Sequence, residues 1–378
     1  ITQNNIVAVL SALSATLLAG TPRGGERIAF LPLCHIAERM IGEYVPIMRR
    51  QVVNFVENPE TVFENLREIQ PSVFFAVPRV WEKIYSQVMI TLSEAGKLQQ
   101  AAYAWALSVG DEVAQAEAQG RGPGGWLALR SWLARVAVMN NVLRMTGLSR
   151  VQAAMTGAAP ISPELIRWYW KLGVPLREGW GMTETCGGGT LNPRGKSRPG
   201  SIGRPGPGLE MRIAEGTNEI LLRGPNVILG YLNQPEKTAE TIDAEGWLHT
   251  GDVGRVDDDG YFYITDRMKD IIITAGGKNV TPSEWENELK FSPYVTDAVI
   301  IGDKRAYLTV LVMIDQENVE KYAQDHDVPF SNYASLTRAK EVQDLIWREI
   351  ERVNSKFARV EQVKKFRLLE NQLTAEDE

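Results

Sequence analysis

Cysteine and histidine are scarce in this sequence. Two cysteines occur in 378 residues, Cys34 and Cys186, far apart and in no spacing that would bind a metal ion. This argues against a disulfide framework and indicates a reducing compartment, so we expect a cytoplasmic protein. The three histidines, His35, His249 and His326, are too few and too scattered for a metal site built from histidine side chains.

Long apolar runs and an excess of basic residues are also lacking. The most apolar segment, residues 6–20, is too short for a transmembrane helix and contains Ser11, Ser14 and Thr16. The formal net charge of −6 and the pI of about 5.4 argue against a nucleic-acid-binding protein, which usually has a basic face. We therefore expect no membrane span and no nucleic acid partner.

What is present is the composition of a globular protein with more than one domain. Hydrophobic residues make up 44% of the chain, and 378 residues suffice for two or three domains with cores of their own. In residues 1–190, short apolar runs at 28–33, 73–77 and 151–155 alternate with segments of helical periodicity. This alternation predicts an α/β domain with a parallel sheet between helical layers.

The run VPLREGWGMTETCGGG at residues 174–189 is the first candidate for a ligand site. A short apolar strand leads into a glycine turn that presents Trp180, and Thr183 and Glu184 follow. A flat aromatic ring suits a nucleotide base, a hydroxyl suits a phosphate and a carboxylate suits Mg²⁺. The alternative is a glycine-rich loop around one buried tryptophan, because short motifs often occur by chance.

Two further segments follow predicted strand ends, where α/β sheets bind ligands. The loop TGAAP at 156–160 belongs to the βα unit next to that of Trp180, so both loops are expected at one sheet edge with a flat ligand between them. His35 follows the apolar run 28–33. Its alternative role is that of a buried core histidine with satisfied hydrogen bonds.

Residues 92–146 interrupt the alternation and predict an inserted helical hairpin with a glycine-rich turn at 119–125. Apolar residues recur at helical spacing on both sides of the turn: Leu98, Ala102, Trp105, Val109 and Val113 before it, and Trp126, Leu129, Leu133, Val136 and Leu143 after it. Two interpretations stay open. The stripes pack against the sheet, or they form a lid or a membrane-facing surface for a greasy substrate, at the inner face of a membrane.

The second half of the chain has a different character. Glycine, proline and short strand patterns in residues 191–268 predict a small β-barrel, and residues 269–378 predict a separate α+β domain. Asp252 and Arg267 flank one predicted hairpin. A carboxylate can accept both hydroxyls of a ribose and a guanidinium can donate to sugar or phosphate, the alternative being an exposed ion pair of little consequence.

The order of the motifs carries more information than each motif alone. TGAAP, EGWGMTET, EILLRGPNVILGY, WLHTGD, ITDRMKD and TAGGKNVTP occur in one chain. This series resembles the adenylate-forming superfamily of acyl-CoA synthetases, firefly luciferase and nonribosomal adenylation domains, over essentially the whole chain. LPLCHIAER, VPRVWEKIY, the helical hairpin and REGWGMTETCGG look most like long-chain fatty acid–CoA ligases. The resemblance implies a large domain with α/β and β-barrel parts and a mobile C-terminal domain.

The resemblance also implies a role for each motif position. An adenine pocket would be lined by Ala158, Glu178, Gly179 and Trp180, the last replacing the tyrosine that relatives usually have. Thr183 would bind the α-phosphate of ATP and Glu184 would hold Mg²⁺. Asp252 and Arg267 would bind the ribose, and His35 would lie near the reacting carboxyl group. Lys269 would be the hinge of the small domain, and Gly276 and Gly277 would line the tunnel for CoA.

The reaction implied is the ATP-dependent conversion of a fatty acid to acyl-AMP and then to acyl-CoA. Two departures accompany the likeness: the family's phosphate loop (TSGTTGxPKG) and its C-terminal lysine are absent, while ITQNNIVA and LTAEDE resemble the segments that follow and precede them. We therefore expect a fragment of a longer ligase that turns over poorly or not at all. The alternatives are a non-catalytic nucleotide- or acyl-binding protein and a fatty acyl-AMP ligase that serves a carrier protein.

Overall fold

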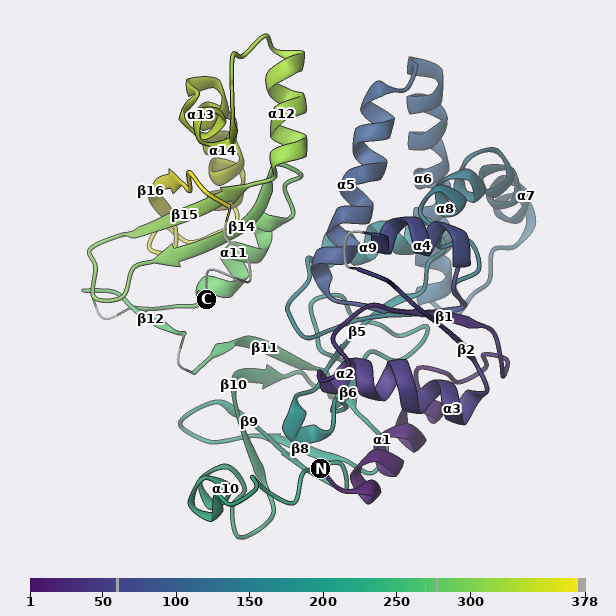
Figure 1. Ribbon diagram of the computed structural model, residues 1–378, viewed down its shortest axis with the longest axis vertical. Coiled ribbons are helices and arrows are strands. Elements are labelled where there is room, and N and C mark those ends of the chain that lie inside the picture. Colours follow the sequence, from purple (N-terminus) through teal and green to yellow (C-terminus); the bar gives the residue numbers. More distant parts are fainter. Residues whose placement is uncertain (59–60, 269, 277, 373–378) are drawn as a thin grey trace. The chain divides into compact units, whose positions relative to one another are not determined.

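The computed structural model describes residues 1–58, 61–268, 270–276 and 278–372. The chain divides into two compact units, Ile1–Ile264 and Thr265–Glu378 (Figure 1). Within the described residues, no helix combines the length and the hydropathy needed to cross a membrane.

The central sheet of the first unit has the strand order β3-β4-β5-β6-β7. Its first three strands are parallel, as predicted, and the last two extend it in antiparallel pairing. Every residue of β3 and β4 is buried, which explains why both strands are uninterrupted apolar or small-residue runs. The strands are β3 (Val73–Ala76), β4 (Ala153–Thr156), β5 (Leu176–Trp180), β6 (Thr190–Leu191) and β7 (Arg204–Pro205).

A separate parallel pair and a set of helices accompany this sheet. The strand predicted at 28–33 starts two residues earlier and ends at Ala29. The pair consists of β1 (Glu26–Ala29) and β2 (Val52–Phe55), and the helices are α1 (Gln3–Ala15), α2 (Ile36–Glu38), the π-helix Arg39–Tyr44, α3 (Val45–Arg49), α4 (Val62–Ile69), α5 (Pro78–Glu94) and α9 (Pro163–Lys171).

The helices start where the sequence predicts, but some of them lack the predicted capping hydrogen bonds. In the sequence, Pro78 and Pro163 predict first helical positions and Ser162 predicts a helix cap. Both prolines do begin helices, α5 and α9, and the Ser162 hydroxyl accepts a hydrogen bond from the Glu164 amide at 3.2 Å. The run Thr61-Val-Phe-Glu64 predicts a capping box at the start of α4. This prediction is wrong, because the Thr61 hydroxyl donates instead to the Asn58 carbonyl at 3.1 Å. Thr281 and Glu284 predict a second capping box, which is also wrong, since the Thr281 side chain makes no capping hydrogen bond.

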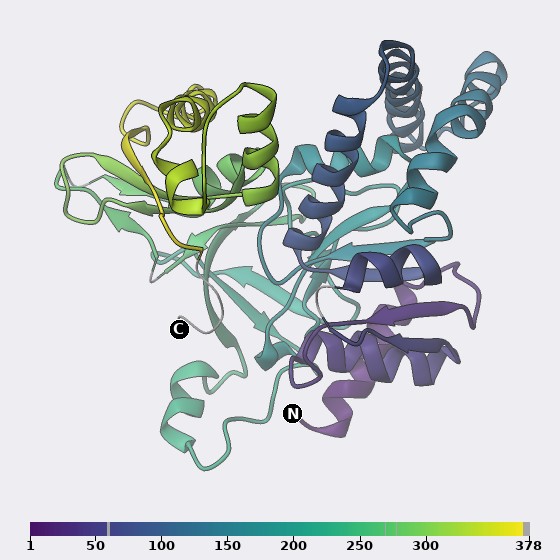
Figure 2. The same cartoon turned by 45° about the horizontal axis from the view of Figure 1, so that its top comes forward.

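The predicted helical hairpin is confirmed. It comprises α6 (Lys97–Ala118), α7 (Gly125–Ala134), the π-helical segment Arg135–Met139 and α8 (Asn140–Met145). Its helices project beyond the sheet of the first unit (Figure 2). The buried face of α6 is centred on Tyr103, Ala106, Val109 and Gly110 and packs on α9, where the Trp168 indole donates to the Tyr103 hydroxyl at 2.9 Å.

The two predicted stripes of the hairpin differ in outcome. Val109 and Leu143 are buried, and Val109 belongs to the face of α6 that packs on helix α9. Most of the stripe on α7 is exposed to solvent, so for this helix the packing interpretation is wrong. The exposed members of the predicted stripes are Leu98, Trp105, Trp126, Leu129, Leu133 and Val136.

A second sheet, of order β11-β10-β9-β8, follows in the chain. Ile202, Ile220 and Phe262 form a small core here, and Trp180 packs against it. The elements are β8 (Glu210–Ile213), β9 (Glu219–Arg223), α10 (Pro235–Thr241), β10 (Leu248–Val256) and β11 (Phe262–Arg267). The register of β10 against β9 shifts between His249 and Val253, so the segment that contains Asp252 leaves the regular ladder.

The second unit is the α+β arrangement that the sequence predicts. β14 pairs antiparallel with β15, which pairs parallel with β16. Helical spacing in the sequence predicts an amphipathic helix with one apolar stripe, and this stripe is fully buried in the core: Val342, Ile346, Ile350 and Val353. The elements are β12 (Ile272–Ile273), β13 (Asn279–Val280), α11 (Pro282–Lys290), β14 (Val295–Ile301), β15 (Leu308–Ile314), α12 (Gln316–Asp325), α13 (Tyr333–Arg338), α14 (Lys340–Asn354) and β16 (Val363–Leu368).

Candidate functional site

Trp180 and Asp252 lie side by side although 72 residues separate them. Trp180 ends β5, and Asp252 stands in the irregular part of β10. The indole Nε1 donates a hydrogen bond to Oδ2 of Asp252 at 2.8 Å, and the carboxylate is buried. The structure therefore brings the predicted aromatic ring and the predicted ribose-binding carboxylate together. The hydrogen bond between them is charge-assisted, which makes it stronger than a bond between neutral groups.

The backbone at Gly189 fixes the position of the indole. The chain turns back after Trp180, and the Gly189 amide donates to the Trp180 carbonyl at 3.0 Å. A Cβ atom on Gly189 would lie 2.7 Å from Cε3 and Cζ3 of the indole, closer than carbon atoms can approach. Glycine is thus required at this position by the ring itself.

The loop after β4 contacts the end of β5, at the sheet edge where the sequence predicts a ligand. A Cβ atom on Gly157 would lie 2.8 Å from the Gly179 carbonyl oxygen, and Thr156 pairs with Glu178 in the parallel ladder. Ala158 has a left-handed backbone with φ of 69°, which turns the loop sharply out of the strand. Ala158, Glu178 and Gly179 therefore occupy one edge, next to Trp180.

The Glu178 carboxyl group is buried beside this edge. Its Oε2 accepts a hydrogen bond from the Gly200 amide at 3.2 Å. Burial, only partly offset by this bond, raises the pKa of Glu178 to about 8. At neutral pH the group is therefore largely protonated, so that it can donate one hydrogen bond as well as accept others.

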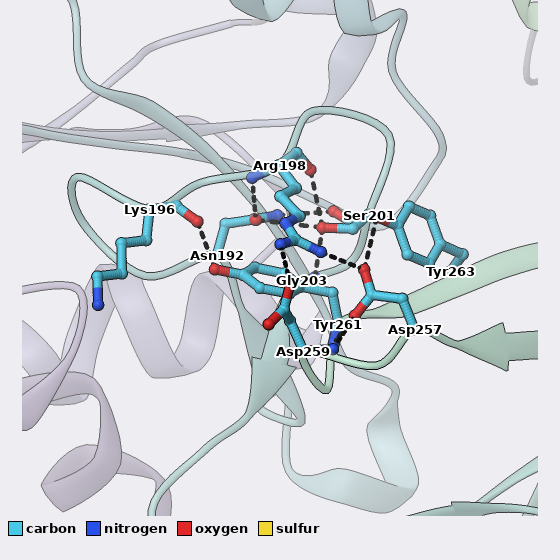
Figure 3. A network of polar contacts seen from close by, with 9 residues as sticks. All are labelled: Asn192, Lys196, Arg198, Ser201, Gly203, Asp257, Asp259, Tyr261 and Tyr263. Atoms are coloured by element: carbon cyan, nitrogen blue, oxygen red, sulfur yellow. Dashed lines mark hydrogen bonds and ion pairs between the residues drawn. The ribbon is translucent and has the colours of Figure 1, made fainter. Parts of the chain in front are cut away.

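A polar network braces the loop that contacts Glu178 (Figure 3). The Asn192 side chain donates to the carbonyls of Glu178 at 3.2 Å and Ser201 at 2.6 Å. The Arg198 guanidinium binds Asp257 and Asp259. Asp257 also accepts from the amides of Asp259 and Tyr261. These bonds confirm the hairpin turn that the run Asp257-Asp-Asp-Gly260 predicts.

Glu184 stands on a 3₁₀ turn, Thr183–Thr185, between β5 and β6. The Tyr231 hydroxyl donates to its Oε1 at 2.7 Å, and the Ile228 amide donates to its carbonyl at 2.9 Å. Burial and the bond to Glu184 both raise the pKa of Tyr231, so the phenol stays protonated as the donor. The Thr183 side chain on the same turn is exposed.

Three further residues belong to the site and are not predicted from the sequence: Tyr231, Asn226 and Asn5. Asn226 donates to the carbonyls of Thr185 (3.3 Å) and Gly188, and so braces the turn that carries Glu184. Asn5 on α1 in turn donates to the carbonyls of Pro225 and Val227, both at 2.8 Å. The only available signal was that Tyr231 and Asn226 belong to the motif EILLRGPNVILGY, which gives no partner.

His35 is exposed, so its alternative role as a buried core histidine is wrong. Its Nδ1 accepts the Ala37 amide at 3.2 Å and caps α2, which requires the neutral tautomer with hydrogen on Nε2. The short helix that it starts continues into Met40, whose sulfur lies 3.9 Å from that of Cys186. His35 thus begins a segment packed on the Glu184 loop.

Other predicted site residues belong to the second unit. Arg267 is exposed at the end of β11, where its amide donates to Asp266 at 2.7 Å. Gly276 lies in a turn with open space around it. The convergence of Arg267 with Asp252 stays a prediction, because the two residues belong to different units. Lys269 and Gly277 lie outside the described residues.

The Glu184 carboxylate suits a Mg²⁺ ion that is bound together with a phosphate ligand. Among the described residues, no group of three or more histidine, cysteine, aspartate or glutamate side chains could hold a metal ion by itself. Mg²⁺ commonly keeps several waters and takes one or two carboxylates plus substrate phosphate oxygens. The hydrogen-bonded carboxylate of Glu184 fits that pattern.

Two protein-family models match this chain. Residues 1–232 match the model of the AMP-binding enzyme family, and residues 269–375 match that of the AMP-binding enzyme C-terminal domain. The chain belongs to the AMP-binding enzyme family. This agrees with the resemblance to adenylate-forming enzymes found in the motifs, and with the α/β fold and small C-terminal domain.

Relatives within the family are named as fatty-acid ligases. The chain is 39% identical over 351 residues to the putative fatty-acid–CoA ligase fadD11 of Mycobacterium tuberculosis, covering 92% of the chain and 61% of the relative. It is 35% identical to the long-chain-fatty-acid–CoA ligase ACSBG2 of Gallus gallus, covering 81% and 41%. The chain thus spans about three fifths or less of the length of these relatives.

Solved structures share the fold at lower identity. The adenylation domain of a carboxylate reductase from Mycobacterium chelonae matches with a TM-score of 0.71 at 22% identity, covering 98% of the chain and 52% of that structure. The O-succinylbenzoate coenzyme A synthetase MenE of Bacillus subtilis, in complex with ATP and magnesium, matches with a TM-score of 0.62 at 21% identity, covering 98% and 62%. These likenesses show the adenylate-forming fold.

Proposed function

We propose that the protein containing this chain is a long-chain fatty acid–CoA ligase. Membership of the AMP-binding enzyme family supports ATP as a substrate, and relatives at 32–39% identity named as fatty-acid–CoA ligases support the fatty acid and CoA. The geometric observation that carries the proposal is the hydrogen bond between Trp180 and Asp252, which puts an aromatic face and a buried carboxylate together.

The adenosine half of ATP would be bound by residues of the shared sheet edge. Adenine lies against the Trp180 indole, within a pocket lined by Ala158, Glu178 and Gly179. Asp252 accepts the ribose hydroxyls, for which its carboxylate is oriented by the indole N–H. Because Glu178 is largely protonated at neutral pH, it presents a donor to a base nitrogen without placing a negative charge in the pocket.

The phosphates would lie over the turn Thr183–Thr185. The exposed Thr183 hydroxyl donates to the α-phosphate, and Glu184, oriented by Tyr231, holds Mg²⁺. When bound, Mg²⁺ neutralises charge on the phosphate oxygens. The side chains of the turn orient the α-phosphate for attack, which is the main contribution a protein makes to phosphoryl and nucleotidyl transfer.

The reaction has two steps. A carboxylate oxygen of the fatty acid bonds to the α-phosphorus while the bond to pyrophosphate breaks, giving acyl-AMP. The CoA thiol, on losing its proton, then attacks the acyl carbon, and AMP leaves. Under this proposal His35 lies near the reacting carboxyl, Arg267 assists at the ribose, Lys269 is the hinge of the second unit, and Gly276 and Gly277 line the CoA path.

The test is pyrophosphate release by the full-length protein. With MgATP and a series of fatty acids of increasing chain length, we expect release that depends on the acid, and Asp252→Ala is expected to abolish it. Release without acyl-CoA formation, together with transfer to a carrier protein, would replace CoA by a carrier as the acceptor. No release with any acid would overturn the enzyme proposal and leave a nucleotide- or acyl-binding protein.

We also propose that the protein acts in the cytoplasm. Both cysteines are free thiols, Cys34 exposed and Cys186 buried, which suits a reducing compartment. Labelling of Cys34 by a thiol reagent in intact cells and lysates would test this. Protection of Cys34 in both, released by a reductant, would contradict it.

A further inference from the structure

The Asp252 carboxylate stands at the end of a bulge in β10. Residues 250–252 of this strand lie opposite the single residue Ile220 of β9, so the two strands lose their regular pairing here. The backbone is left-handed at Gly251, with φ of 74°, a conformation that glycine adopts at low cost. Because a bulge changes the direction in which its side chains point, the direction of the Asp252 carboxylate depends on what holds the bulge in place.

The buried side chain of Glu219 on β9 holds this bulge at two points. Its Oε1 accepts a hydrogen bond from the Gly251 amide at 2.8 Å, and its Oε2 lies 2.9 Å from Nδ1 of His249. The two contacts lie on either side of Thr250 in the chain. One carboxylate thus binds both the residue directly before Asp252 and the last regularly paired residue before the bulge.

Thr250 extends these contacts to Asp252 itself. Its hydroxyl donates to the Ile220 carbonyl at 2.7 Å and accepts a hydrogen bond from the Asp252 amide at 3.1 Å. The Asp252 carboxylate in turn accepts the indole N–H of Trp180 at 2.8 Å. Asp252 is therefore held at its backbone by groups bound to β9, and at its carboxylate by the end of β5.

His249 restrains the Glu219 side chain from the solvent side, since the imidazole is 39% exposed and the Glu219 side chain 10%. A carboxylate is an acceptor only, so Nδ1 carries the hydrogen of the bond between them. The other ring nitrogen, Nε2, faces Oδ2 of Asp243 at 4.0 Å. Asp243 is fixed by its own turn, where its Oδ1 accepts the amides of Glu245 and Trp247, both at 2.9 Å. The imidazole therefore lies between two carboxylates, which limits its rotation.

We propose that Glu219, supported by His249, is a positioning residue for Asp252 and thereby sets the preference of the site for a nucleotide with ribose hydroxyls. The inference rests on the proposed function, because that function assigns Asp252 to the ribose. Hydrogen bonds weaken steeply when their angles change, whereas stacking on an aromatic ring tolerates small shifts. Release of the bulge should therefore weaken contacts with the ribose hydroxyls before it weakens binding of the base.

Titration calorimetry of the full-length protein with the Mg²⁺ complexes of ATP and of dideoxy-ATP, which lacks both ribose hydroxyls, tests the proposal. The unaltered protein should bind ATP at least about tenfold more tightly than dideoxy-ATP. In Glu219→Ala the affinity for ATP should fall by about tenfold while the affinity for dideoxy-ATP stays nearly constant, because the lost bonds involve the hydroxyls.

Two further variants separate positioning from a general loss of structure. Glu219→Gln should restore the preference for ATP, since its amide oxygen can accept from Gly251 and its amide nitrogen can donate to Nδ1 of the other His249 tautomer. His249→Ala should lower the preference by only about threefold, because the bond to the Gly251 amide remains. In a chain that already carries Asp252→Ala, Glu219→Ala should cause no further loss of ATP affinity.

The matched control is Glu210→Ala, which removes an exposed carboxylate of the same sheet that is paired with Arg223 at 2.8 Å. We expect this variant to keep the full preference for ATP. An unchanged preference in both Glu219→Ala and His249→Ala, or an equal loss of affinity for both nucleotides, would overturn the inference and assign the two residues to stability alone. An unaltered protein that binds ATP and dideoxy-ATP equally would overturn, together with the inference, the proposed role of Asp252 at the ribose.

Discussion

The indole nitrogen of Trp180 donates a hydrogen bond to Oδ2 of Asp252 at 2.8 Å, joining the last residue of β5 to the irregular segment of β10. The bond links two motifs of the sequence, EGWGMTET and WLHTGD. Because the carboxylate is buried, the indole both orients it and compensates part of its desolvation. A tyrosine at this position could not make the same bond from the same ring, so the tryptophan combines an aromatic surface with a fixed donor.

Loss of this hydrogen bond should weaken nucleotide binding. Trp180→Phe keeps an aromatic face but removes the N–H, and a hydrogen bond to a charged group contributes about 1.5–3 kcal/mol. We expect the affinity for MgATP to fall by about tenfold or more in titration calorimetry. Trp126→Phe, a change at an exposed tryptophan of α7, is the control and should bind MgATP normally. Equal affinity of Trp180→Phe and the unaltered protein for MgATP would show that this hydrogen bond does not contribute to nucleotide binding.

Glu184→Gln should make ATP binding less dependent on Mg²⁺. The amide keeps the shape and accepts the Tyr231 hydroxyl, but it lacks the charge that attracts the cation. We expect weaker binding of MgATP, with a smaller effect on ATP measured without the metal. Calorimetry with and without Mg²⁺ separates the two, and an unchanged response to the metal would exclude Glu184 as its ligand.

Tyr231→Phe tests whether the hydroxyl positions Glu184. Since a single hydrogen bond to a carboxylate is lost, we expect MgATP affinity to fall by about tenfold. In a double-mutant cycle with Glu184→Gln, the two effects should be clearly less than additive, because Tyr231 acts on MgATP only through the carboxylate that Glu184→Gln has already removed. Fully additive effects would indicate that Tyr231 acts independently of the carboxylate.

Gly189→Ala should disturb the indole directly. The added methyl group would lie 2.7 Å from two ring carbons of Trp180, so the ring or the backbone must shift. We expect a loss of stability of roughly 1–3 kcal/mol, as for overpacked sites, and weaker nucleotide binding. Gly122→Ala is the control, since a Cβ atom there would have no neighbour within 4 Å. Equal denaturation midpoints for both variants would contradict the assigned position of the ring.

The buried carboxyl of Glu178 should give a pH-dependent stability. Its pKa is raised from 4.5 to about 8, so the folded state binds more protons than the unfolded state between these values. The stabilising contribution is therefore complete below about pH 4.5 and is lost as the pH rises to 8. Urea unfolding of the unaltered protein and of Glu178→Gln should be compared across this pH range. Relative to the variant, the free energy of unfolding of the unaltered protein should fall by up to several kcal/mol as the pH rises. A constant difference between the two would contradict an ionisation of this group in that window.

The sequence contains enough to predict the sheet and the position of its ligand edge, but not the partners of each side chain. Apolar runs such as 73–77 define strands, and glycine turns after them place Trp180 and Ala158 at one edge. The roles of Tyr231 and Asn226 are not predictable from the sequence, because their hydrogen-bond partners are distant along the chain. Glu184 is 47 residues from Tyr231, and Thr185 and Gly188 are 41 and 38 residues from Asn226, so only folding brings these groups together.

The α7 helix shows a second limit. Its periodicity correctly predicts one apolar face, yet periodicity says nothing about whether another element covers that face. The capping box at Thr61 fails for a related reason. A short motif permits a hydrogen bond to the helix amides, but the same hydroxyl can donate to the preceding turn instead. In this structure the Thr61 hydroxyl donates to the Asn58 carbonyl and makes no bond to the helix amides.

The most direct test of the adenosine site is a crystal structure of the full-length protein with AMP. We expect the adenine ring against the Trp180 indole and the ribose hydroxyls within hydrogen-bond distance of Asp252, with the indole–carboxylate bond of 2.8 Å retained. AMP bound elsewhere, with Trp180 and Asp252 making no contact with it, would contradict the account.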